Sequence, residues 1–172
     1  MQIIQGKNKV KGMSNKAIAA NIGLAAAVVL CVVSTFLPWM RAVDGSSATA
    51  YDSYFSGVPE TLLIPSGIIL VAVALNVFKH NKATRILSGV IGIIASLVIG
   101  GMSLIVYFND KGGVNSMNSY SSSSLGISSN GFVAIGPGNY LAMLSAVAIL
   151  VFAILAFFGK SRKKMEAKAV EA

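Results

Sequence analysis

Charged residues, cysteine and histidine are all scarce in this sequence. Of its 172 residues, 12% are charged, whereas a soluble domain carries roughly 25%. The single cysteine, Cys31, has no partner for a disulfide or a cysteine metal set, and the single histidine, His80, has no carboxylate or second histidine nearby. Because 55% of the residues are hydrophobic, the composition is that of a membrane protein.

Motifs of enzymes and cofactor sites are also absent. The sequence has no Gly-x-Ser-x-Gly elbow, His-Glu-x-x-His helix or phosphate-binding loop. Asp44, Asp52, Glu60 and Asp110 lack the spacing of a metal loop. We therefore expect a protein that is not an enzyme and that holds no cofactor or metal.

Four apolar runs have about the length, 20 residues, that a helix needs to cross a bilayer. They cover residues 17–39, 61–78, 86–108 and 140–159, and none of them contains a charged residue. The second is the shortest and has Pro65 in its first turns, where proline is tolerated. These runs predict an all-α membrane protein in which residues 1–172 form a single domain of four transmembrane helices.

The orientation follows from the basic residues, because cytoplasmic segments next to spans are rich in lysine and arginine. Residues 1–16, 79–85 and 160–172 hold all of these residues except Arg41 and Lys111. We expect these three segments on the cytoplasmic side of the plasma membrane, so that both termini are cytoplasmic and residues 40–60 and 109–139 form outer loops. An uncleaved first span is expected, since its apolar run is longer than the 7 to 15 residues typical of signal peptides.

The formal charge of +8 indicates membrane lipids with anionic headgroups as partners, and not nucleic acid, because the basic residues flank the spans. The strongest cluster for headgroup contact follows the fourth span: Lys160, Arg162, Lys163 and Lys164. Aromatic side chains anchor span ends at the interface. The expected anchors are Trp39, Tyr107 and Tyr140.

Small residues at every fourth position mark faces for close helix packing. The first span has Ala19, Gly23, Ala27, Cys31 and Thr35, and the third has Ser88, Gly92, Ser96 and Gly100. We expect these two stripes to meet, within one chain or across a homo-oligomer. Asn21 and Asn76 lie near cytoplasmic span ends, where capping or headgroup contact is the expected role.

The second outer loop divides into two parts. Its first half is rich in serine, asparagine and glycine and is expected to be flexible. In its second half, Asn130-Gly131 lies between apolar stretches, which is a signal for a short β-hairpin over the outer helix ends. Asn130, Gly131 and Phe132 are the candidate recognition residues if this loop binds a partner, and a plain connecting loop is the alternative.

Two segments, Phe36-Leu37-Pro38-Trp39 and Gly136-Pro137-Gly138-Asn139-Tyr140-Leu141, together with the four-helix layout, resemble small, mostly uncharacterised bacterial integral membrane proteins. This resemblance implies a prokaryotic plasma membrane. Claudin-type proteins share the layout, but their paired cysteines are missing from the first outer loop. The expected function is that of a structural or accessory subunit associated with a membrane-protein partner. The alternatives are an immunity, exclusion or signalling-accessory protein that recognises a factor through its outer loops, and a small oligomeric pore or transporter component.

Overall fold

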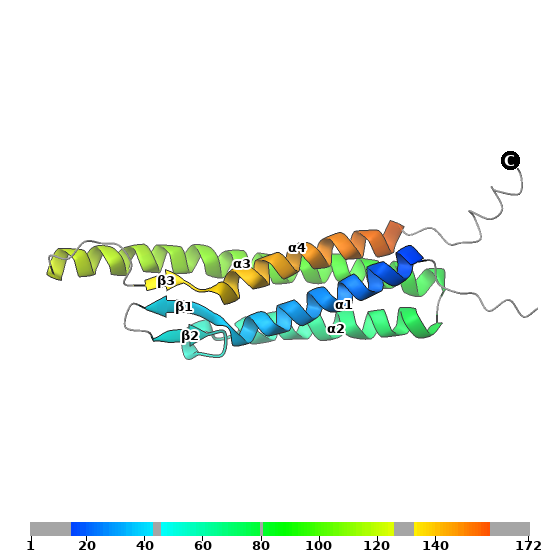
Figure 1. The fold of residues 1–172 in the computed structure, drawn as a ribbon, viewed down its shortest axis with the longest axis horizontal. Coiled ribbons are helices and arrows are strands. Elements are labelled where there is room, and N and C mark those ends of the chain that lie inside the picture. Colours follow the sequence, from blue (N-terminus) through cyan, green and yellow to red (C-terminus); the bar gives the residue numbers. More distant parts are fainter. Residues whose placement is uncertain (1–14, 43–45, 80, 126–132, 159–172) are drawn as a thin grey trace, which may run out of the picture.

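The computed structural model describes residues 15–42, 46–79, 81–125 and 133–158, and its main feature is four long helices that lie side by side (Figure 1). These helices are α1 (Asn15–Phe36), α2 (Val58–Lys79), α3 (Lys82–Leu125) and α4 (Pro137–Phe158). Each is long and apolar enough to cross a membrane, with mean hydropathies between 2.3 and 2.8. The predicted four long apolar helices are therefore confirmed, and they are compatible with a multi-pass membrane protein.

Helix α2 is longer than its apolar run, because it begins at Val58 and includes Pro59 and Glu60 in its first turn. Proline is favoured in the first turn, because the N–H groups of that turn have no acceptor within the helix and the missing N–H of proline costs no hydrogen bond. An acidic residue there interacts favourably with the positive end of the helix dipole. The Thr61 hydroxyl bonds the carbonyl oxygen of Val58 at 2.9 Å in the same turn. Residues 58–60 and Lys79 thus extend the second span to 22 residues, with Pro65 inside it.

The four helices form a ring in which α4 packs against α1 and α3, and α2 packs against the same two helices. Within one chain, the expected meeting of the first and third spans is therefore not the main contact, because α1 and α3 lie diagonally across the bundle. A contact between the two stripes across a homo-oligomer stays a prediction. Both small-residue stripes approach α4: Gly23 lies against the Phe152 ring, and a Cβ on Gly92 would lie 2.7 Å from the Cβ of Ala153. A stripe shows that a helix has a close neighbour but not which helix that is.

Most members of the two stripes are inside the bundle. Ala19 is exposed and Gly100 is half-buried, whereas the other members are buried: Gly23, Ala27, Cys31, Thr35, Ser88, Gly92 and Ser96. The alanines of α4 provide the third small surface, with Ala142, Ala146 and Ala153 each 4% exposed or less. Small residues on both sides bring the helix backbones close together, as membrane helices require for packing.

A three-stranded antiparallel sheet covers one end of the bundle, which we call the sheet end. Its strands are β1 (Pro38–Ala42), β2 (Ser47–Thr49) and β3 (Val133–Ile135), in the order β2-β1-β3. The predicted hairpin within residues 125–135 differs from this arrangement, because β3 pairs with β1, with Met40 opposite Ile135. Leu125, the first residue of the other predicted arm, ends α3, while Asn130, Gly131 and Phe132 lie outside the described residues.

Helix α3 continues far past the predicted span of residues 86–108. It has 44 residues, so at about 1.5 Å per residue it is roughly twice as long as the 30 Å hydrocarbon core of a bilayer. The first half of the loop expected at 109–139 is thus helical as far as Leu125, and β3 packs against this helix. Once a helix is nucleated, each added residue gains a hydrogen bond, so a serine-rich segment can extend it.

Candidate binding site at the sheet end

Trp39 joins the sheet to the bundle. Its side chain is fully buried, its indole Nε1 donates a hydrogen bond of 2.8 Å to the carbonyl oxygen of Ser34, and its ring centroid is 5.8 Å from that of Phe55. The expectation that Trp39 anchors the chain in lipid is therefore wrong, because β1 folds the indole back under the sheet. There it satisfies one of the carbonyl groups left without an intrahelical donor at the end of α1.

The two segments that carried the bacterial resemblance contact each other. The Gly136 amide donates a hydrogen bond of 2.6 Å to the carbonyl oxygen of Trp39, and a Cβ on Gly136 would collide with the Pro38 carbonyl. A Cβ on Gly138 would collide with the Trp39 indole. Glycine at both positions thus lets the start of α4 lie directly against β1, a contact between distant segments that no local pattern predicts.

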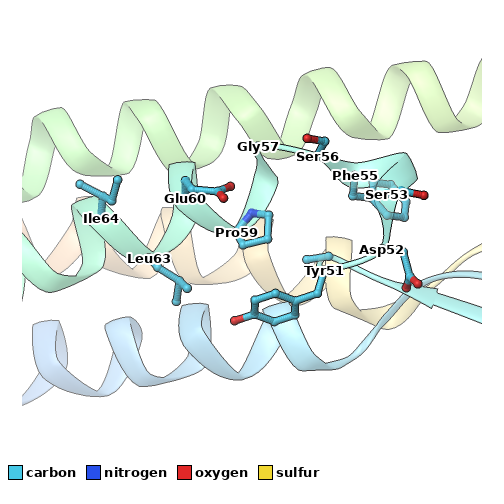
Figure 2. Close-up of a pocket in the computed structure, with 11 residues that line it drawn as sticks. Tyr51, Asp52, Ser53, Phe55, Ser56, Gly57, Pro59, Glu60, Leu63 and Ile64 are labelled. Atoms are coloured by element: carbon cyan, nitrogen blue, oxygen red, sulfur yellow. The ribbon is translucent and has the colours of Figure 1, made fainter.

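An open pocket of about 440 Å³ lies beside this junction, between the segment after β2 and the first turns of α2 (Figure 2). Leu63 and Ile64 lie toward one end of it and Asp52 and Ser53 toward the other. Its lining consists of Ala50, Tyr51, Asp52, Ser53, Phe55, Ser56, Gly57, Pro59, Glu60, Leu63 and Ile64. We call this the sheet-end pocket.

The lining of the sheet-end pocket contains both acidic and apolar side chains. Asp52 is held in place, since its Oδ2 accepts hydrogen bonds from the amide and the hydroxyl of Thr49. Glu60 is exposed in the first turn of α2. Neither lysine nor arginine is among the lining residues, so a positively charged group with an apolar stem complements the lining.

Tyr51 ties the sheet-end pocket to the end of α1. Its ring centroid is 5.3 Å from that of Phe36, and its hydroxyl oxygen is 3.4 Å from the hydroxyl oxygen of Thr35. Gly57, whose φ is 86°, turns the chain into α2 on the other side of the pocket. The pocket thus lies between the end of α1 and the start of α2.

Two polar side chains are buried at the sheet end without hydrogen bonds to all of their atoms. Asp110 is 1% exposed and its Oδ2 has no partner, and Asn139 is fully buried with neither amide atom bonded. The sequence placed Asp110 in a loop, whereas the continuation of α3 puts it in the interior. A charged or polar group buried in this way is costly.

The remaining predicted residues divide between described and undescribed segments. Tyr107 and Tyr140, expected to be interface anchors, lie next to each other on α3 and α4, with ring centroids 6.0 Å apart. The proposed headgroup residues Lys160, Arg162, Lys163 and Lys164 lie outside the described residues. Among the residues that the structure does describe, no group of three His, Cys, Asp or Glu side chains is placed to hold a metal ion.

Asn21 and Asn76 have a different role from the expected capping or headgroup contact. Both are at least 96% buried, and the Asn76 Nδ2 donates a hydrogen bond of 3.1 Å to the Asn21 Oδ1. The bond joins α1 to α2 at the end of the bundle opposite the sheet. The two asparagines must lie at the same level of neighbouring helices to form this bond. Because they are 55 residues apart in the sequence, no local sequence pattern predicts that they meet.

Comparison with known proteins identifies no relative of this chain. No protein-family model matches the chain, and no curated protein matches it. The resemblance to small bacterial membrane proteins stays a prediction.

Proposed function

We propose that this chain is an accessory subunit of the plasma membrane that binds another membrane protein through its sheet end. Both termini are cytoplasmic in this proposal and the sheet end faces outward. The distribution of lysine and arginine supports that orientation, because Arg41 and Lys111 are the only basic residues in the two segments that contribute to the sheet end.

The sheet-end pocket is the observation that carries the proposal. Asp52 and Glu60 supply negative charge, Leu63 and Ile64 supply apolar surface, and the end of α1 fixes Tyr51. An arginine or lysine of a partner fits such a lining, because its stem is apolar and its head is cationic. No covalent step is part of this proposal, which needs only binding.

The projecting part of α3 provides a second surface for the same partner. Residues beyond Asn109 extend past the start of α4, and the sheet lies alongside them (Figure 1). A helix and a sheet that are already folded lose little conformational freedom on binding, which favours affinity.

The proposal is tested by gentle detergent extraction of the tagged full chain from its native membrane, followed by identification of stoichiometric partners. Glu60→Lys is expected to reduce partner recovery by about tenfold, the equivalent of losing roughly 1.4 kcal/mol of binding. Ala83→Lys is the control, since Ala83 is exposed on α3 at the opposite end of the bundle and does not line the pocket. Equal recovery with Glu60→Lys and with the unchanged chain contradicts the proposal.

Two further outcomes separate this proposal from its alternatives. A lone monomer that protects its host against an incoming factor supports an immunity or exclusion role, in which the factor occupies the sheet-end pocket. A pore through one bundle is less well supported, because large side chains from each helix fill the interior at 0% exposure: Leu24, Leu62, Ile69, Ile99 and Ile149. Solute flux through the reconstituted protein would overturn that argument.

A further inference from the structure

One side of α2 is exposed along the whole length of the helix. Of the four apolar spans, that of α2 has the smallest share of buried residues, 28%, compared with 33–39% in the other three. Exposed residues recur on this helix at alternating steps of four and three positions, which places them in one stripe. We call this stripe the α2 seam, and its members are Glu60, Ile64, Gly67, Val71, Ala74 and Phe78.

The α2 seam faces away from the bundle. Leu62, Ile69 and Asn76 are 0–3% exposed and face the interior, and the α2 seam lies on the opposite side of the helix. From Glu60 to Phe78 the helix rises about 27 Å at 1.5 Å per residue, close to the 30 Å hydrocarbon core of a bilayer. A membrane-spanning helix of another protein can therefore lie along all of the α2 seam.

Gly67 gives the α2 seam a place for close approach. Nothing lies within 4 Å of its Cβ position, so no contact inside the chain requires glycine there, whereas a Cβ on Gly23, Gly89 or Gly92 would meet a neighbouring helix. Glycine is less favourable than alanine inside a helix, but on the surface of a membrane helix it lets a second helix approach the backbone. Ala74 provides a second small side chain about two turns further along.

The sheet-end pocket indicates which kind of helix fits the α2 seam. Glu60 and Ile64 belong both to the α2 seam and to the pocket lining, and Figure 2 shows them on the same side of α2. Asp52 adds a second carboxylate to the lining, which contains neither lysine nor arginine. A helix that follows the α2 seam thus reaches two carboxylates at the sheet end, and a cation at that end of the helix complements their charge. Gly101 on α3 has an equally open Cβ position, but no residue of α3 lines the pocket.

We propose that one transmembrane helix of the partner packs along the α2 seam and inserts a lysine or arginine at its sheet-end terminus into the sheet-end pocket. The partner is that of the proposed function, on which this inference rests. In the proposed orientation the sheet end faces outward, where basic residues are rare beside membrane spans. A lysine or arginine at the outer end of a span therefore distinguishes the partner helix from most others.

Leucine substitutions at two open glycines test the α2 seam in the full chain, extracted gently from its native membrane. Gly67→Leu fills the place of close approach and is expected to lower recovery of the partner about tenfold, since overpacking weakens a close contact. Gly101→Leu adds the same side chain at an open position on α3 and is expected to change recovery by less than about twofold. Because both Cβ positions are open, both variants are expected to fold, and denaturant unfolding in detergent checks this.

Photo-crosslinking in the native membrane identifies what lies against the α2 seam. Val71 and Leu144 are both 61% exposed, and Leu144 is on α4, diagonally across the bundle from α2. A photoreactive side chain at Val71 is expected to crosslink to a membrane span with a lysine or arginine at its outer end, and one at Leu144 is not. A crosslink from Val71 to lipid alone or to a second copy of this chain overturns the proposal, as does equal crosslinking of the partner from both positions.

The results for the glycine variants and for Glu60→Lys distinguish this inference from the proposed function. If Glu60→Lys lowers recovery of the partner while Gly67→Leu behaves like Gly101→Leu, the helix contact is overturned and binding at the sheet end stands. If no partner is recovered with the unchanged chain, the proposed function is overturned and the helix contact with it.

Discussion

The indole Nε1 of Trp39 donates a hydrogen bond of 2.8 Å to the carbonyl oxygen of Ser34, five residues earlier in the chain. This bond connects the first residues of the sheet to the last turn of α1. The indole is also the surface on which Gly138 of α4 rests. Two helices and the sheet therefore depend on one side chain.

Replacement of Trp39 by phenylalanine is expected to lower the free energy of unfolding by about 1–3 kcal/mol, because the buried Ser34 carbonyl loses its donor. Trp39→Ala is expected to cost about 3–5 kcal/mol, since a cavity is added. Denaturant unfolding in detergent micelles measures both values. Phe78→Ala is the control, because Phe78 is 86% exposed and its loss is expected to change stability by less than about 0.5 kcal/mol. A similar loss in all three variants would show that Trp39 has no special role.

Gly138→Ala is expected to destabilise the protein by about 1–3 kcal/mol, because the added Cβ collides with the Trp39 indole. Gly67→Ala provides the matched comparison on α2. Nothing lies within 4 Å of its Cβ position, and alanine is favoured over glycine inside a helix by about 0.5–1 kcal/mol. Opposite signs for the two substitutions, read from the same unfolding experiment, are the expected result. A stabilising Gly138→Ala would contradict the close contact between α4 and β1.

Periodicity and composition were sufficient for some parts of the fold and not for others. The four spans were predictable because about 20 consecutive apolar residues have few alternatives to a membrane helix. Asp44-Gly45, which lies between β1 and β2 in the sequence, is a dipeptide that favours a hairpin and agrees with the antiparallel pairing of these two strands. Asn130-Gly131 carries the same signal, yet the described strand that follows it, β3, pairs with β1.

The candidate sites were less predictable, because they depend on contacts between distant segments. Asp52 and Glu60 both lie in the predicted outer loop of residues 40–60, but no local pattern shows that they line one pocket together. That pocket lies where Gly57, with its positive φ, turns the chain from the segment after β2 into α2. The small-residue stripes identified close-packed helices without identifying α4 as their partner. A helix propensity scale also gives no reason for α3 to continue through a serine-rich segment as far as Leu125.

The Asn21–Asn76 pair is expected to show strong coupling in a double-mutant cycle. Asn21→Leu or Asn76→Leu alone leaves a buried amide without its partner, which costs about 1–3 kcal/mol. The double variant replaces both amides by apolar groups and is expected to be more stable than the sum of the single losses predicts. Cycles in another membrane protein average about 0.6 kcal/mol of coupling per hydrogen bond. Strict additivity of the unfolding free energies would show that the two amides act independently.

Two aspartates at the sheet end are expected to respond in opposite directions to the same substitution. The Oδ2 of Asp110 is buried without a partner, so Asp110→Asn removes a charge that the interior does not offset, and we expect a gain in stability of about 1 kcal/mol or more. The Oδ2 of exposed Asp52 accepts two hydrogen bonds from Thr49, and Asp52→Asn weakens them, with a loss of up to about 1 kcal/mol. Unfolding of both variants at neutral pH measures the difference. A loss of stability in Asp110→Asn would contradict this prediction and would indicate that the carboxylate interacts with a cation or a donor in the folded protein.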